Sequence, residues 1–283
     1  MKLVSYTILG RESFGAIEDD SIVDLGNRVA GVQSLLEALQ RQQLAALQEY
    51  VRSAKADVPL ASVHLLPPVP NPPKIICVGL NYTAHAIEVH AEIPEYPALF
   101  IRLANTLVPH NGSLIRPKVS EQMDFEGELA LVIGKGGRYI NNTEALSHVA
   151  GYACFNDGSI RDFQFKHSLA AGKNFPATAG FGPWLVTSDE IPDPSQLLLE
   201  TRLNDDVVQS STTSDLIFDV PSLISYISTF TPLEPGDVIA TGTPKGVGFG
   251  RQPPLWMKPG DTVEVTITRI GALRNSIRAE RDH

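Results

Sequence analysis

The chain opens with two short runs of strand-like pattern, KLVSYTIL at residues 2–9 and FGAIEDDSIVDL at residues 14–25. Short apolar runs separated by turn-forming residues are typical of strands. The next segment, GVQSLLEALQRQQLAALQEYVRSA, carries its leucines mostly three or four residues apart. That spacing predicts one or two amphipathic helices between residues 31 and 54. The chain is therefore expected to begin with a small α+β unit.

Five prolines then fall within seven residues, from Pro67 to Pro73. Because proline lacks a backbone N–H and fixes its own φ angle, this density excludes a helix or a central strand. We therefore expect three parts. Residues 1–66 would form a small N-terminal domain, residues 67–73 a proline-rich linker, and residues 74–283 a larger domain.

Beyond the linker, short β-like runs such as KIICVGL, GELALVIG and DTVEVTITRIG alternate with Gly, Pro, Asn and Asp. This pattern predicts a mostly β domain, of the kind that folds over into a barrel. One stretch, VPSLISYISTFTPL at residues 220–233, has helical periodicity instead, and Pro221 suits the first turn of a helix. The predicted fold class is α+β and mostly β.

One β-like run, DFEGELALVIG at residues 124–134, combines an apolar character with a row of acids. Because side chains alternate across a sheet, Asp124, Glu126 and Glu128 would point to one face of a strand. Phe125 and Leu129 would point to the other face. The apolar flanks favour a central strand, in which like charges on one side would repel each other.

Composition narrows the possible partners and the compartment. Hydrophobic residues make up 43% of the chain and charged residues 19%, as in soluble globular proteins. The formal net charge of −9 argues against nucleic acid and anionic membranes as partners, since both favour basic patches. Cys77 and Cys154 lie in apolar surroundings and are expected to be buried free thiols. With neither a membrane-length apolar run nor a signal-peptide pattern, a cytoplasmic protein is expected.

A metal ion would explain the acidic row. Buried carboxylates must be protonated, paired with a cation or bound to a metal, and few Lys or Arg residues surround Glu126 and Glu128 in the sequence. Another acid, Asp157, follows a second apolar run. All-oxygen ligands favour the hard cations Mg²⁺, Mn²⁺ or Ca²⁺ over Zn²⁺. The alternative is a solvated sheet face, which is the more frequent meaning of a Glu-x-Glu pair taken alone.

Several motifs together resemble the fumarylacetoacetate hydrolase family. They are Glu126-x-Glu128, the D-x-S-x-R-D-x-Q string that begins at Asp157, GLNYTAHAIE (79–88), GKNFPATAGFGPW (172–184), TGTPKGVG (241–248) and KPGD (258–261). They occur in the order of the family and cover essentially all of the chain after the linker. The resemblance implies a mixed β-roll-like catalytic domain behind a small N-terminal α+β domain, and a homodimer.

The resemblance also implies a site. Glu126, Glu128 and Asp157 would bind one Mg²⁺ or Mn²⁺, whereas Asp124 would not be a ligand but a solvated or hydrogen-bonded residue near the rim. His85 and Glu88 stand three residues apart, on one face of a short helix. They would form the pair that activates water, within a segment, residues 82–96, that can act as a lid in relatives.

Further residues are assigned roles by their places in the motifs. Lys173 and Gln164 would donate to an oxygen that gains charge, and Arg161 would pair with Glu126 or Glu128, or else hold Asp162. Tyr82, Arg102 and Thr243 would contact the substrate. Arg102 replaces a lysine frequent in relatives and would favour a carboxylate, and Gly158 would open space near the metal.

The implied function is a metal-dependent hydrolase that cleaves a C–C bond in a β-diketo acid. Its small anionic substrate would be an acylpyruvate, fumarylpyruvate or a 2,4-diketo-3-deoxy sugar acid, and the metal would stabilise an enolate. An oxaloacetate-type decarboxylase or a 2-hydroxymuconate-type isomerase or hydratase would use the same enolate. A member of the family that binds metal without catalysis is the alternative from another class.

Overall fold

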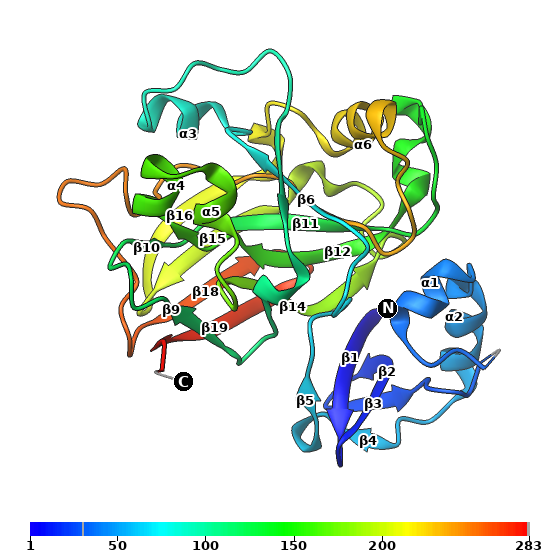
Figure 1. The fold of residues 1–283 in the computed structure, drawn as a ribbon. Coiled ribbons are helices and arrows are strands. Elements are labelled where there is room, and N and C mark those ends of the chain that lie inside the picture. The colour runs from blue at the N-terminus through cyan, green and yellow to red at the C-terminus, as the bar shows by residue number, and fades with distance from the viewer. Residues whose placement is uncertain (30, 282–283) are drawn as a thin grey trace.

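The computed structural model describes residues 1–29 and 31–281, and one twelve-stranded mixed sheet runs through this part of the chain (Figure 1). Across the sheet its strands are β4 (Val58–Pro59), β3 (Ser21–Asp24), β2 (Arg11–Glu18), β1 (Lys2–Ile8), β14 (Ala179–Thr187), β12 (Val149–Asn156), β11 (Gly127–Ile133), β17 (Val238–Ala240), β6 (Ile75–Gly79) and β7 (Ala98–Arg102). Beside this path, β5 (His64–Leu65) pairs with β1 and β8 (Leu107–Val108) pairs with β14.

A second sheet of five strands packs against the first. In order it contains β16 (Asp206–Thr212), β15 (Leu198–Leu203), β18 (Thr262–Ile267), β19 (Gly271–Ala279) and β9 (Ser113–Arg116). Leu129 and Leu131 of β11 share one hydrophobic cluster with Leu199 and Val265 of this sheet. A two-stranded ladder of β10 (Met123–Asp124) and β13 (Ser159–Ile160) completes the β structure.

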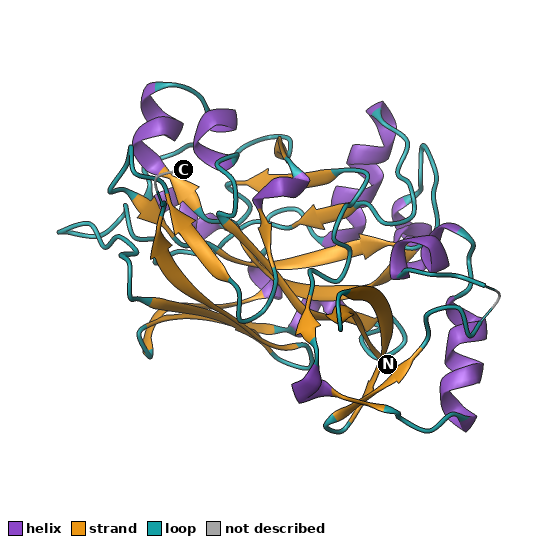
Figure 2. Cartoon of the chain, turned by 60° about the horizontal axis from the view of Figure 1, so that its bottom comes forward, coloured by secondary structure: helices purple, strands orange, loops and turns teal. Residues whose placement is uncertain are grey.

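Helices lie at the edges and ends of the sheets (Figure 2). They are α1 (Leu35–Gln40), α2 (Leu44–Ser53), α3 (Thr83–Glu88), α4 (Arg161–Lys166), α5 (Leu169–Lys173) and α6 (Val220–Phe230). Short 3-10 helices occur at Leu60–Ser62, Ala104–Thr106, Asn142–His148, Pro194–Gln196 and Thr213–Asp215. None of the helices in the described residues is long and apolar enough to span a membrane.

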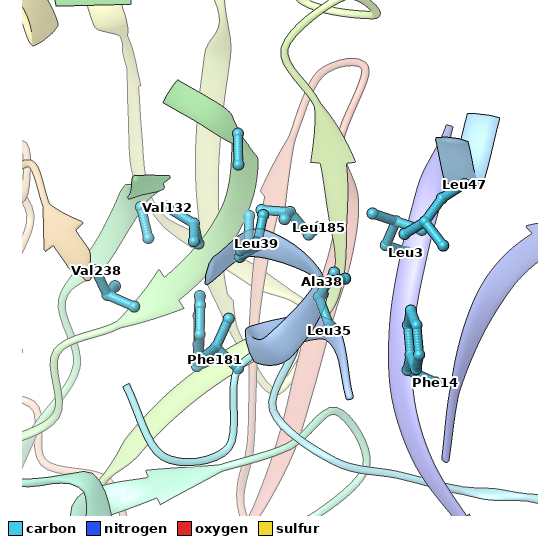
Figure 3. Close-up of a cluster of buried hydrophobic side chains, with 14 of the residues drawn as sticks. Leu3, Phe14, Leu35, Ala38, Leu39, Leu47, Val132, Phe181, Leu185 and Val238 are labelled. Carbon is cyan, nitrogen blue, oxygen red and sulfur yellow. The ribbon is translucent and has the colours of Figure 1, made fainter. Parts of the chain in front are cut away.

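The first thirty-odd residues share a hydrophobic core with the rest of the chain (Figure 3). In the close-up, Leu35, Ala38 and Leu39 of α1 share one cluster with side chains of the large sheet. Leu3 and Phe14 come from its N-terminal strands β1 and β2, and Val132, Phe181, Leu185 and Val238 come from its central strands. The ladder continues too, because Lys2 and Leu3 of β1 pair with Val186 and Leu185 of β14.

Most of the predicted elements are present. The leucine-rich segment forms two helices, α1 and α2, and the apolar segment after Asp219 forms α6. In α6, Pro221 lies in the first turn and the Asp219 side chain caps the helix by accepting the Ser222 N–H. The mostly β fold class is confirmed. Cys77 and Cys154 are buried free thiols, as expected.

The acidic run is the element that differs from its prediction. Residues 124–134 were expected to form one strand, but the chain leaves β10 after Asp124 and enters β11 at Gly127. From Gly127 onward the prediction of a central strand is confirmed, since β11 lies between β12 and β17. Glu126 therefore lies in the break between β10 and β11, and the three acids do not share one continuous strand.

Candidate metal and active site

A cavity of about 390 Å³ opens where β6, α3, the start of β11 and the helices α4 and α5 meet. In Figure 1 these elements lie at the end of the molecule away from the N-terminal strands. The polar side chains of the lining are His85, Glu126, Glu128, Asp157, Arg161, Gln164, Lys173 and Thr243. All eight were singled out in the sequence, and the structure brings them to one place.

Two neighbouring strands place the carboxylates. β11 and β12 are antiparallel, with Glu128 opposite Phe155, so the beginning of β11 meets the end of β12, where Asp157 follows. The Glu126 N–H donates to Asn156 Oδ1 at 3.0 Å, and the Asp157 N–H donates to the Glu126 carbonyl at 2.8 Å. These bonds bring Glu126 and Asp157 together, although thirty residues separate them in the chain.

The three acids form a compact buried group. One carboxylate oxygen from each of Glu126, Glu128 and Asp157 lies within 4.8 Å of the others, and all three residues are buried. Glu126 accepts hydrogen bonds from Arg161 Nη2 at 2.5 Å and Lys173 Nζ at 2.6 Å. Burial alone would raise its pKa, but these two cations outweigh burial and hold the pKa of Glu126 below its ordinary value.

Glu128 has the opposite environment. Its carboxylate accepts the Gly242 N–H at 2.9 Å, and within the described chain it forms no ion pair with Lys or Arg. Burial, with the neighbouring charges of Asp157 and Glu126, raises the pKa of Glu128 well above its ordinary value. This carboxylate is therefore the one whose negative charge the protein itself leaves uncompensated.

Such a group suits a divalent cation. Three carboxylates supply only oxygen ligands, which are the donors that Mg²⁺ and Mn²⁺ prefer. A cation among them would neutralise Glu128 and relieve the repulsion from its two neighbours. The residues present therefore fit Mg²⁺ or Mn²⁺.

His85 and Glu88 are both carried by α3. His85 Nδ1 and Glu88 Oε2 are 3.3 Å apart, and His85 lines the cavity while Glu88 lies behind it. Glu88 is also held by the Gly246 N–H, at 2.9 and 3.0 Å from its two oxygens. Although burial opposes it, hydrogen bonding from His85 and Gly246 lowers the pKa of Glu88, so this side chain is a carboxylate that orients the imidazole.

The side chains of Lys173, Arg161 and Gln164 are engaged with one another or with the acids. Lys173 Nζ donates to Glu126 and to Asp157 Oδ2 at 2.5 Å. Arg161 Nη1 donates to Gln164 Oε1 at 3.0 Å, which leaves the amide NH₂ of Gln164 for a ligand. Of the two alternatives for Arg161, the ion pair with Glu126 is present, while Asp162 instead accepts a bond from Ser120.

Four expectations need correction. Arg102 is 2% exposed, lies outside the cavity lining, and donates to Asp157 Oδ1 at 2.5 Å, so it holds a candidate ligand and does not reach a substrate. Tyr82 is 1% exposed and also lies outside the lining. Gly158 opens no space, since a Cβ there would lie 2.1 Å from the Thr178 carbonyl oxygen. Asp124 is hydrogen-bonded but completely buried, not solvated at a rim.

Thr243 lines the cavity, but its hydroxyl is already used. It donates to the Gly127 carbonyl at 3.0 Å and accepts from Gln209 Nε2 at 2.8 Å. Gln209 also accepts the Gly127 N–H at 2.9 Å, so this residue of β16 fixes the backbone between Glu126 and Glu128. Sequence reasoning missed Gln209, because it lies in an ordinary alternating strand with no motif around it.

Comparison with known proteins gives these residues a family. The family model described as fumarylacetoacetate (FAA) hydrolase C-terminal matches residues 74–278. Oxaloacetate tautomerase YisK of Bacillus subtilis is 45% identical over 224 residues, which cover 77% of this chain and 74% of that protein.

Two solved structures extend the likeness to the whole chain. Maleylpyruvate hydrolase from Sphingobium sp. SYK-6, in complex with manganese(II) ion and pyruvate, has a TM-score of 0.82 at 28% identity, covering 99% of this chain and 100% of that chain. The 5-carboxymethyl-2-hydroxymuconate delta-isomerase from Mycobacterium smegmatis has a TM-score of 0.79 at 32% identity, covering 100% of both chains. The protein belongs to the fumarylacetoacetate hydrolase family, a family of enzymes whose relatives named here are a tautomerase, a hydrolase and an isomerase.

Proposed function

We propose that the protein is a divalent-cation-dependent enzyme that interconverts the keto and enol forms of a short 2-oxo acid, with oxaloacetate as the first substrate to test. The observation that carries this proposal is that the imidazole of His85 and three buried carboxylates line one cavity. The name of the Bacillus subtilis relative, an oxaloacetate tautomerase, supports the choice of reaction.

Glu126, Glu128 and Asp157 would hold Mg²⁺ or Mn²⁺. The bound cation supplies electrophilic stabilisation of the negative charge that develops on the 2-oxo oxygen. The charge balance of the buried cluster suits an anionic acid. The cluster contains four carboxylates, Asp124, Glu126, Glu128 and Asp157, and three basic side chains, Arg102, Arg161 and Lys173. With all of them ionised the cluster has one excess negative charge, and a bound divalent cation would change this to one excess positive charge.

His85 would move the proton. With Nδ1 bonded to Glu88, the ring nitrogen left for the cavity is Nε2. It can take a proton from C3 of the keto form and deliver a proton to the 2-oxo oxygen, which gives the enol, and the reverse transfers regenerate the keto form. The free NH₂ of Gln164 can donate to the substrate oxygen that gains charge in that step. Tautomerisation consumes no water, so a cavity with a partly apolar lining suits it.

Hydrolysis of a C–C bond in a β-diketo acid is the second candidate. The cavity is of a size that holds drug-sized ligands, and part of its lining is apolar, including Val89, Leu99, Phe165, Leu169 and Phe249. This volume and apolar lining suit an acyl chain carried by the 2-oxo acid group. In this reaction His85 and Glu88 would activate a water molecule against the distal carbonyl.

One spectrophotometric panel separates these candidates. Freshly dissolved enol-oxaloacetate, acylpyruvates, fumarylpyruvate and 2,4-diketo-3-deoxy sugar acids would each be followed with Mg²⁺, Mn²⁺ or EDTA, for the native protein and for His85→Ala. Faster loss of the oxaloacetate enol without release of CO₂ or pyruvate, dependent on the cation and on His85, is the proposed outcome. Cation-dependent cleavage of a diketo acid with no effect on the oxaloacetate enol would replace the proposal by the hydrolase, and cation binding without any turnover would overturn both.

A further inference from the structure

Asp124 is a buried carboxylate that the proposed function does not use. It is fully buried and lies outside the cavity lining, so it cannot touch a substrate. Its oxygens accept four N–H groups. Oδ1 accepts from Gly248 at 2.7 Å and from Phe125 at 2.8 Å, and Oδ2 accepts from Arg161 Nε at 2.8 Å and from Phe249 at 3.1 Å.

Four donors converging on one side chain require a carboxylate. An ionised Asp offers acceptor sites on both oxygens, whereas the isosteric Asn offers one oxygen and places an NH₂ group against the remaining donors. Because the site is buried, water cannot replace the lost bonds at little cost. The full set of contacts therefore depends on both carboxyl oxygens of Asp124.

Two of these donors belong to the loop formed by residues 241–251, which follows β17. The same loop holds Glu88 through the Gly246 N–H. Gly246 has a φ of +106°, and a Cβ there would lie 2.1 Å from the Val208 carbonyl oxygen, so the loop reaches Glu88 only with glycine at this position.

The other end of Asp124 leads to the candidate metal ligands. Arg161 donates to Asp124 through Nε and to Glu126 through Nη2, and its guanidinium also lies 4.4 Å from the centre of the Phe249 ring. A continuous path of contacts therefore runs from Glu126 through Arg161 and Asp124 into the loop, and from the loop at Gly246 to Glu88 and His85.

We propose that Asp124 is a positioning residue that fixes His85 relative to the carboxylate group, by fastening loop 241–251 to Arg161. This inference rests on the proposed function, in which His85 moves the proton. A rise in the distance between His85 and the carboxylates would slow proton transfer, while the carboxylates themselves would keep their ligand atoms.

The first test needs no substrate. Amide hydrogen exchange of Gly246, Gly248 and Phe249 would be measured by NMR in the native protein, Asp124→Asn and Asp162→Asn. Asp162 is a matched control, because it is a carboxylate next to Arg161 that bonds to Ser120 and not to the loop. We expect exchange at Gly246 to rise by about tenfold or more in Asp124→Asn and to stay unchanged in Asp162→Asn. Unchanged protection of Gly246 in a folded Asp124→Asn would overturn the proposal.

The second test is a double-mutant cycle with Glu88→Gln. Asp124→Asn alone should lower kcat by about tenfold to a hundredfold, with KM and the Mn²⁺ affinity changing by less than about threefold. In the Glu88→Gln background it should lower kcat by less than about threefold, since the path it serves is already broken. Effects that multiply would mean that Asp124 acts elsewhere, which contradicts the proposal.

If Asp124→Asn does not accumulate as a folded protein, Gly246→Ala tests the same path of contacts between Glu126 and His85. It breaks the path at the Glu88 end and leaves Arg161 untouched, so its loss of kcat should also fail to multiply with that of Glu88→Gln. Multiplying losses would again contradict the proposal. If the native protein turns over no oxo acid, the proposed function fails, and the exchange experiment alone still decides whether Asp124 fastens the loop.

Discussion

Two buried carboxylates in the same large sheet have opposite electrostatic environments. Asp24, at the end of β3, is 4% exposed and accepts hydrogen bonds from the Tyr6 hydroxyl at 2.7 Å and the Ser13 hydroxyl at 2.5 Å. Arg11 and Arg28 each lie 3.7 Å from its other oxygen. Glu128, at the start of β11, is 1% exposed and has only a backbone N–H as its hydrogen-bond donor within the described chain.

The pKa directions record the same difference. Although burial opposes it, the hydrogen bonds from Ser13 and Tyr6 lower the pKa of Asp24. Burial, aided by Asp157 and Glu126, raises the pKa of Glu128. Asp24 is not among the residues that line the cavity described above, whereas Glu128 lines it together with Glu126 and Asp157. Burial alone therefore does not mark a carboxylate as part of a binding site. A buried carboxylate that has no cationic partner and lines a cavity is a candidate for one.

The largest expected effect follows from removing the uncompensated charge. Glu128→Gln keeps an acceptor for the Gly242 N–H but loses a candidate ligand, so turnover should fall by about a thousandfold or more. Steady-state kinetics at saturating Mg²⁺ on the substrate identified by the panel would measure it. Asp24→Asn, the matched change in the compensated carboxylate, should leave kcat within about twofold of the native value. Equal losses in both variants would remove the distinction between them.

The next effect separates the carboxylate side of the cavity from the proton-transfer side. His85→Ala should lower kcat by about a hundredfold to ten-thousandfold, because the group that moves the proton is gone. The affinity of His85→Ala for Mn²⁺ should stay within about threefold of the native value, since His85 does not belong to the group of candidate metal ligands. Loss of Mn²⁺ binding in His85→Ala would instead make the imidazole a ligand.

The sequence predicts the chemistry of this site better than its geometry. The acids, His85 and Lys173 could be recognised because each lies in a short motif, and β11 because its apolar residues are continuous. The break between β10 and β11 could not be foreseen, since Phe125 and Glu126 fit a strand as well as their neighbours do. Long-range contacts were also hidden. Nothing local shows that Arg102 turns inward to Asp157 or that β1 extends the sheet beside β14.

A moderate effect on stability is expected at the compensated carboxylate. Asp24→Asn should lower the free energy of unfolding by about 1–3 kcal/mol, because buried hydroxyl donors and two arginines lose a charged partner. Urea unfolding would measure this loss. Without divalent cation, Glu128→Gln should leave the protein as stable as the native form or more stable, since it removes an unpaired buried charge. A strong destabilisation by Glu128→Gln would show that its charge is compensated after all.

The smallest expected effect is a difference in pH dependence. In EDTA, a Glu128 whose folded pKa is raised favours folding at low pH, so the native protein should lose stability relative to Glu128→Gln as pH rises through that pKa. The contribution of Asp24 to stability changes with pH in the opposite direction. Its contribution is present above its ordinary pKa of 3.8 and is lost as pH falls through the lower folded value. Thermal unfolding in EDTA, followed from acidic to mildly alkaline pH, would record both slopes. Slopes of the same sign would contradict the comparison.

The central claim is that a divalent cation binds among the buried acids and balances their uncompensated charge. Calorimetric titration of Mn²⁺ into EDTA-treated, dialysed protein tests it most directly, with the native chain, Glu128→Gln and Asp24→Asn side by side. The account predicts one Mn²⁺ per chain for the native protein and for Asp24→Asn, and an affinity weaker by about a hundredfold or more for Glu128→Gln. Equal Mn²⁺ affinity in all three proteins, or none in the native one, would contradict it.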